Sequence, residues 1–152
     1  GDVGMAYAIA YYSRLGYTIN IPLTDSQDYD IIVDTGTELF KVQIKTTRFK
    51  SKFNVYQVGL RTSGGNRSGN KTKFFTENSS DLVFILTEVG DCYSIPRKEI
   101  TNKTTINLGE EYEKYKVSFF PKSENFMKSC DITPTLDKPK IYKNKHNKTK
   151  NI

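Results

Sequence analysis

The spacing of apolar side chains predicts that the chain begins with a helix and continues as strands. From Val3 to Leu15, apolar residues recur at close to helical spacing, and Gly16 follows where a C-terminal cap is expected. Asp2 precedes this segment, and its carboxylate could cap the free N–H groups of the first turn. Tyr17 to Ile21 then predicts a short strand.

An apolar run followed by an alternating run predicts a β-hairpin. Asp30 to Asp34 and Glu38 to Thr46 are joined by Thr35-Gly36-Thr37, a connection of hairpin length with glycine at the turn. Phe53 to Arg61 also alternates, which predicts a third long strand.

The second half of the chain predicts another pair of strands. Asp81 to Thr87 is the most apolar run and is typical of a buried strand, and Cys92 to Ile95 pairs back after a turn. Pro96 to Ile100 predicts a short helix with proline at its first position. We therefore expect an α/β (α+β) fold, in which an N-terminal helix packs on a mixed central β-sheet.

Two polar segments interrupt or follow this pattern. Residues 61–73 contain three glycines and no apolar side chain, so they predict a flexible excursion from the fold. Residues 137–152 form a tail rich in lysine and asparagine. We expect one domain over residues 1–136, because a chain of 152 residues is large enough for a single core.

Composition favours a polyanionic partner. Lysine and arginine number 23 against 17 acidic residues, which gives a net charge of +6. The alternative interpretation is a compositional bias toward lysine and asparagine without functional meaning. Cys92 and Cys130 suit neither a disulfide framework nor a metal site, so we expect reduced thiols in a cytoplasmic protein. No signal peptide and no run of about 18 apolar residues is present, so no membrane partner is expected.

Polar residues on the predicted hairpin suggest a metal-dependent hydrolytic site. Gln43 and Lys45 share one face of their strand, and the turn brings Asp30 alongside them. Asp30, Gln43 and the main-chain carbonyl of Ile44 would supply the hard oxygen ligands that Mg²⁺ prefers. Lys45 would bind the attacking water or the phosphate. This chemistry suits phosphodiester hydrolysis; the alternative is a solvated polar strand face. The single histidine, His146, argues against histidine catalysis.

The order of several short segments strengthens this interpretation. After a helix that begins with glycine come Gly-Tyr-Thr-Ile-Asn-Ile-Pro, Tyr-Asp-Ile-Ile-Val and Val-Gln-Ile-Lys-Thr. Together they resemble the PD-(D/E)XK nuclease superfamily. With glutamine in place of the second acid, the chain is similar to the cyanobacterial group I intron homing endonucleases of this fold, over roughly residues 1–96. The resemblance implies a restriction-endonuclease-like core with Asp30 as the metal-bridging acid, Gln43 as an oxygen donor and Lys45 as the catalytic lysine.

The chain departs from the family pattern at one position. The family has a glutamate on the first helix directly after the glycine that here is Gly4, and this chain has Met5. A thioether is a poor ligand for a hard cation, so one expected metal contact is missing. The substitution is either natural or introduced to inactivate a nuclease, and the sequence leaves both open.

Basic and amide side chains are candidates for DNA contacts. Arg48, Lys50 and Lys52 follow the catalytic strand and could flank the scissile phosphate. The excursion at residues 61–73 carries side chains suited to reading base edges in the major groove: Arg61, Asn66, Arg67, Asn70, Lys71 and Lys73. The alternative is a solvated insertion loop.

These observations predict a site-specific double-stranded DNA endonuclease of the intron-homing type that uses Mg²⁺ or another divalent ion. Cutting both strands implies a homo-oligomer, a dimer or a tetramer. Three alternatives stay open: a catalytically silent DNA-binding protein on the nuclease fold, a nuclease of the Holliday-junction-resolvase or restriction type, and a basic RNA-binding protein.

Overall fold

The first predicted element is a helix, α1, from Asp2 to Arg14. The computed structural model describes residues 1–24, 26–60, 62–63, 72–73, 79–102 and 104–119. The helix ends because Gly16 has a φ of 80°, a conformation that glycine adopts without steric cost. Gly1 is the N-cap and no side chain caps the helix, so the prediction that Asp2 is the N-cap is wrong. Asp2 lies in the first turn, where its negative charge interacts favourably with the positive end of the helix dipole.

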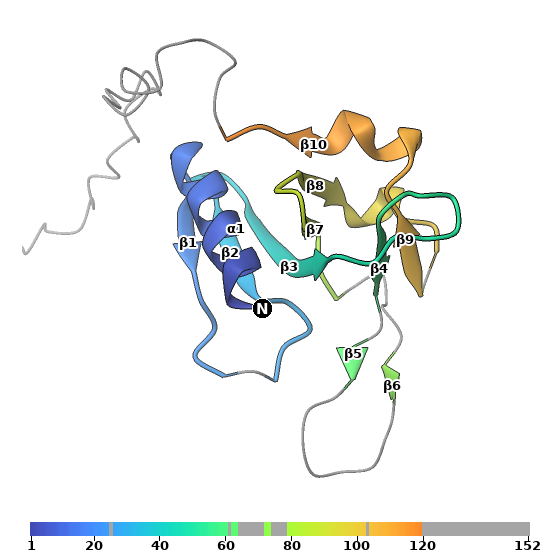
Figure 1. Ribbon diagram of the computed structural model, residues 1–152. Coiled ribbons are helices and arrows are strands. Elements are labelled where there is room, and N and C mark those ends of the chain that lie inside the picture. Colours follow the sequence, from blue (N-terminus) through green and yellow to red (C-terminus); the bar gives the residue numbers. More distant parts are fainter. Residues whose placement is uncertain (25, 61, 64–71, 74–78, 103, 120–152) are drawn as a thin grey trace, which may run out of the picture.

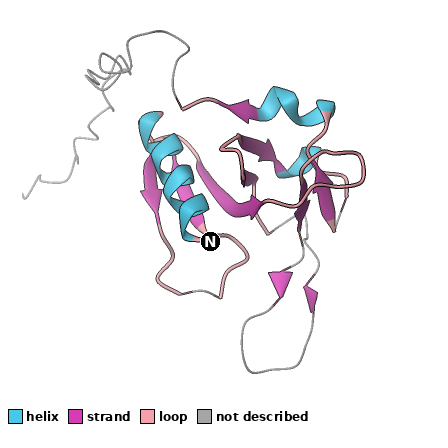
Figure 2. Ribbon diagram, in the orientation of Figure 1, coloured by secondary structure: helices cyan, strands magenta, loops and turns pink. Residues whose placement is uncertain are grey.

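Six strands form the central mixed sheet in the order β1-β2-β3-β7-β8-β10 (Figures 1 and 2). Their bounds are Thr18–Asn20, Ile31–Asp34, Leu39–Thr47, Leu82–Thr87, Cys92–Pro96 and Lys116–Val117. β3 and β7 run parallel, with Gln43 opposite Val83, and the other neighbours are antiparallel. The mixed sheet and the helix packed on it confirm the predicted fold class.

Short elements complete the fold outside the central sheet. β4 (Gln57–Gly59) pairs with β9 (Thr105–Asn107), and β5 (Thr62–Ser63) pairs with β6 (Thr72–Lys73). Two 3-10 helices, η1 and η2, span Arg97–Glu99 and Glu110–Tyr115. β5 and β6 form a ribbon that projects from the body of the molecule (Figure 1).

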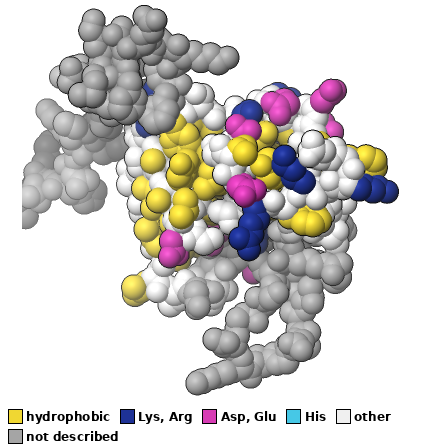
Figure 3. Space-filling model, viewed as in Figure 1, with side chains coloured by type: hydrophobic (Ala, Val, Ile, Leu, Met, Phe, Trp, Pro, Cys, Tyr) yellow, Lys and Arg dark blue, Asp and Glu magenta, His cyan; other side chains and the backbone are white. Residues whose placement is uncertain are grey.

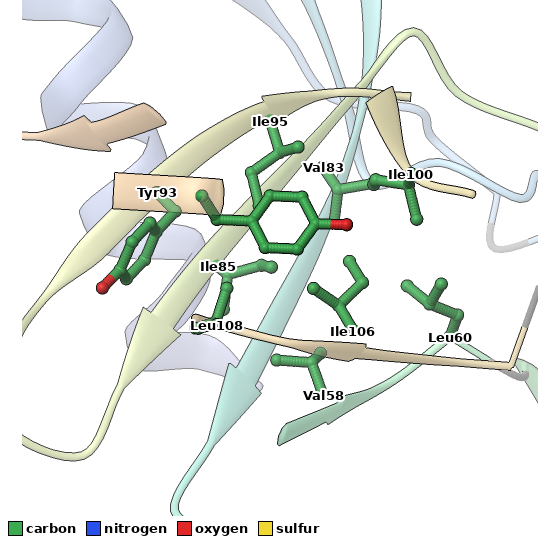
Figure 4. Packing of buried hydrophobic residues seen from close by; sticks show 10 residues of the cluster. Val58, Leu60, Val83, Ile85, Tyr93, Ile95, Ile100, Ile106 and Leu108 are labelled. Carbon is green, nitrogen blue, oxygen red and sulfur yellow. The ribbon is translucent and has the colours of Figure 1, made fainter. Parts of the chain in front are cut away.

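Hydrophobic residues fill both faces of the central sheet. On the α1 face, which we call the helix-side core, the buried residues are Ala8, Tyr12, Ile31, Val33, Val42, Phe84, Leu86 and Cys92. On the other face, the pair β4–β9 and η2 cover the small-sheet core, whose buried residues are Val58, Leu60, Val83, Ile85, Tyr93, Ile95, Ile100, Ile106, Leu108 and Tyr112 (Figure 4). Successive residues of β7 alternate between the two cores, as the strand period requires.

Some predicted elements differ from those observed. Residues 53–61 do not form one long strand: Asn54 has a φ of 58°, which interrupts the extended backbone, and β4 begins only at Gln57. The helix predicted at residues 96–100 is the 3-10 turn η1. The tip of the excursion, residues 64–71, and the tail at 137–152 lie outside the described residues. None of the described helices has the length and hydrophobicity to cross a membrane.

We predict that Gly4→Ala destabilises the fold, although alanine favours helices. A Cβ at position 4 would lie 2.6 Å from Cγ2 of Thr46 and 3.2 Å from Cγ2 of Ile44, so α1 would have to move away from β3. Overpacking of this kind costs about 1 to 3 kcal/mol. Urea denaturation measures the change. Thr46→Ser removes the nearer methyl group, and adding it to Gly4→Ala should recover most of the loss. A more stable Gly4→Ala chain would contradict the close contact.

Candidate active site at the start of β2

The candidate site forms where β2 begins beside β3. The last register pair is Ile31 opposite Val42, and Asp30 precedes it. The N–H of Asp30 donates to the carbonyl of Val42 over 2.9 Å, and Oδ2 of Asp30 accepts from the N–H of Ile44 over 2.5 Å. The carboxylate thus satisfies the Ile44 N–H at the position where β2 no longer pairs with β3. This bond holds Asp30 against the middle of β3.

Gln43 lies beside Asp30 and is almost completely buried. The Asp30 carboxylate accepts from the N–H of the peptide that joins Gln43 to Ile44, so it lies next to Gln43 along β3. Only 3% of Gln43 is exposed, and its Oε1 has no hydrogen-bond partner among the described residues. A buried acceptor without a partner costs about 1 to 3 kcal/mol. Gln43 therefore presents an unused oxygen ligand next to a carboxylate.

Lys45 follows two residues later on the same face. Its register partner is Ile85, and that of Gln43 is Val83; both partners belong to the small-sheet core. Burial lowers the pKa of Lys45, and the negative charge of Asp30 acts in the opposite direction. The ammonium group is therefore partly desolvated and interacts with Asp30. A partly desolvated cation attracts a phosphate more strongly than a fully solvated one does.

The oxygen atoms at this position fit a hard divalent cation. In a strand, the N–H and C=O of one residue point to the same edge, so the Ile44 carbonyl is directed toward Asp30 as its N–H is. A carboxylate, an amide oxygen and a main-chain carbonyl are ligands that Mg²⁺ accepts, and it usually keeps several waters as well. Within the described residues, no group of three His, Cys, Asp or Glu side chains could hold a metal. Among the three candidate ligands, only Asp30 is therefore a carboxylate.

Met5 lies on α1, which packs against β3, and its thioether is a poor ligand for a hard cation. A Cβ on Gly4 would touch Ile44 and Thr46, so the first turn of α1 crosses β3 at the residue that binds Asp30. Met5 is half-buried and packs against the helix-side core. Its role as the position of the family glutamate stays a prediction.

The predicted DNA contacts fall into two groups. Arg48, Lys50 and Lys52 are exposed on the segment between β3 and β4, beyond the end of the strand that carries Lys45. Lys73 belongs to β6. The other candidates lie outside the described residues: Arg61, Asn66, Arg67, Asn70 and Lys71.

Two features near the site were not predicted. Oγ1 of Thr47 donates to the carbonyl of Gln57 over 2.6 Å, which fixes the end of β3 to β4. Phe49 and Phe53 are 61% and 72% exposed between the basic residues of this segment. The alternation of aromatic and basic residues in Arg48-Phe49-Lys50 and Lys52-Phe53 is the sequence signal for these exposed rings.

Comparisons with known proteins identify the family of the chain. A family model for the PD-(D/E)XK endonucleases matches residues 1–125. The chain belongs to the PD-(D/E)XK endonuclease family. Nucleases of this family generally use divalent metal ions. Among solved structures, the chain is similar to a bacterial homing endonuclease, I-Ssp6803I, with 28% identity and a TM-score of 0.62; the match covers 72% of this chain and 76% of that one. No curated protein matches the chain.

We predict that Lys45→Met increases the free energy of unfolding at pH 7. The folded-state pKa of Lys45 lies below its ordinary value because of burial, so the folded protein holds this charge at a cost. As the pH rises through the lowered pKa, the folded state releases the proton first and that cost disappears. The advantage of Lys45→Met should therefore shrink between pH 7 and pH 10.

Urea denaturation of both chains at the two pH values measures this difference. Lys41→Met is the matched control, because Lys41 lies on the same face of β3 but is exposed. A Lys45→Met chain that is less stable than the parent at pH 7 would show that the ion pair with Asp30 outweighs the burial of the ammonium group.

Proposed function

We propose that this chain is a Mg²⁺-dependent, site-specific double-stranded DNA endonuclease of the intron-homing type. The observation that carries the proposal is the buried Oε1 of Gln43, which has no partner among the described residues. Gln43 directly precedes Ile44, whose N–H holds the Asp30 carboxylate. Buried acceptors without a partner are rare in native structures, and a bound ligand is one explanation for such a group. The family assignment and the similarity to a homing endonuclease support the same conclusion.

Each residue of the site has a distinct role in this proposal. Asp30, Gln43 and the Ile44 carbonyl would hold the divalent ion, which when bound neutralises phosphate charge and lowers the pKa of its water. The N–H of Ile44 keeps the carboxylate of Asp30 oriented. Lys45 places its ammonium group against the scissile phosphate or the attacking water, and its partial burial strengthens that attraction.

DNA binding would use the projecting segments around this site. The β5–β6 ribbon extends from the body and has the two-stranded form that enters a major groove (Figure 1). The exposed Arg48, Lys50 and Lys52 would neutralise phosphates near the cut. Their contribution to affinity would fall as the salt concentration rises.

To cut both strands of a duplex, the chain would act as a homo-oligomer, a dimer or a tetramer. One domain presents a single candidate site, and the two strands of a duplex run in opposite directions, so a symmetric pair of chains would place one site on each. Apolar side chains cover the outer face of α1, where Val3 is 62% and Tyr7 39% exposed (Figure 3). Tyr7 also lines an open groove of about 870 Å³ between α1, the β7–β8 turn and residues 116–119. This face is the candidate subunit contact.

The second candidate function is a DNA-binding protein that has lost catalysis. Met5 favours it, because the candidate site carries one carboxylate and the thioether cannot replace the family glutamate. The two functions differ in whether any version of the chain cuts DNA.

We predict that Met5→Glu cuts a randomised linear duplex library with Mg²⁺ at one sequence, and faster than the parent chain. Adding Lys45→Ala to Met5→Glu should reduce the rate by about 10²- to 10⁴-fold, the usual contribution of a catalytic side chain. Sequencing of the cut ends gives both rate and site. Met5→Leu is the control, because it changes the side chain at position 5 without adding a ligand. Specific retention of one sequence with no cutting by any version would establish the silent DNA-binding protein instead.

A further inference from the structure

The segment between β3 and β4 is an ordered hairpin that holds aromatic residues in solvent. The N–H of Gln57 donates to the carbonyl of Phe49 over 2.9 Å, and that of Ser51 to Val55 over 2.8 Å. The N–H of Asn54 closes the tip by donating to Ser51 over 2.9 Å. In Figure 1 this segment is a loop that projects from the edge of the molecule. The backbone is thus fixed, while Phe49 and Phe53 remain 61% and 72% exposed.

The charges around these rings are of one sign. Residues 48–56 contain three cations and no acid, and the Nζ of Lys52 lies 5.0 Å from the centre of the Phe53 ring. Basic and hydrophobic side chains lie together over this edge in Figure 3. By contrast, Val89 is 66% exposed on the β7–β8 turn, but its neighbours include Glu88 and Asp91. Among the described turns that carry exposed apolar side chains, the β3–β4 hairpin is therefore the one that combines an exposed aromatic ring with the positive charge that attracts a polyanion.

We propose that the β3–β4 hairpin, residues 48–56, is a DNA wedge in which Phe53 inserts at a base-pair step while Lys50 and Lys52 hold the flanking phosphates. Proteins that kink DNA insert apolar side chains such as phenylalanine between base steps. A symmetric contact between two copies of this hairpin would instead place three cations against three, which is unfavourable.

The position of the hairpin relates the wedge to the cut. Phe53 follows Lys45 by eight residues, so a fully extended chain would separate them by about 26 Å. Base pairs are spaced about 3.4 Å apart, so the wedge acts within about eight steps of the scissile phosphate. Unstacking there would kink the DNA close to the scissile phosphate. The inference rests on the proposed DNA binding, but it does not depend on catalysis.

A binding experiment without cleavage tests the wedge. An apolar side chain inserts more readily where stacking is already lost, so we use a short linear duplex with and without one central abasic site, in EDTA. The intact chain should bind the abasic duplex about tenfold more tightly than the perfect one, which is the size of one base–aromatic stack. Phe53→Ala should remove that preference. Its exposed position means that the variant should fold, which its melting temperature checks.

Matched variants make the outcome specific. Val89→Ala should keep the preference, because Val89 is an aliphatic side chain of similar exposure, 66%, whose chain neighbours include the acids Glu88 and Asp91. Lys52→Ala should weaken binding to both duplexes equally. A preference that survives Phe53→Ala overturns the wedge, whether or not the sedimentation of the variant changes. Because no metal is present, failure of the wedge is separate from failure of cleavage, which the duplex library measures.

Discussion

The hydrogen bond from the Ile44 N–H to the Asp30 carboxylate is the interaction on which the candidate site depends. It occurs at the single place where β2 stops pairing while β3 continues, so β3 has an N–H without a strand partner. A carboxylate satisfies that N–H and remains able to accept further ligands through its other lone pairs. The same bond places the Asp30 carboxylate at the peptide between Gln43 and Ile44, and the Ile44 carbonyl is directed to the same edge of β3. The point where β2 and β3 stop pairing therefore brings the oxygen donors of the site together.

The remainder of the fold makes this arrangement rigid. α1 packs so closely on β3 that position 4 has no room for a side chain beyond hydrogen, and Thr47 fixes the end of β3 to β4. The site residues themselves oppose stability, because Gln43 has an unsatisfied oxygen and Lys45 is partly desolvated. Strain of this kind is typical of functional sites, where a ligand or substrate compensates for it. The two hydrophobic cores on either side of the sheet supply the necessary stability.

The sequence predicted the parts of the fold that depend on local pattern. The helix and the strands β2, β3, β7 and β8 have clear periodicity, and their parity alone places Gln43 and Lys45 on one face. The pairing of β4 with β9 joins residues about fifty positions apart, and η2 and β10 are too short to produce a pattern. The positive φ of Asn54 divided the predicted third strand, and asparagine adopts that conformation more often than most residues. The burial of Gln43 and the absence of a partner for its oxygen among the described residues could not be predicted, because both depend on long-range packing over this face of the sheet.

Binding of Mn²⁺, followed by electron paramagnetic resonance, tests the central claim most directly, because it asks whether the oxygen donors hold a divalent ion at all. The intact chain should bind one ion, and Asp30→Asn and Gln43→Leu should each weaken that binding at least tenfold, in the range seen when groups that support a metal site are removed. Gln27→Leu, at an exposed glutamine, should have no effect. Unchanged binding by Gln43→Leu would contradict the account, since the buried oxygen of Gln43 would then have no ligand to explain it.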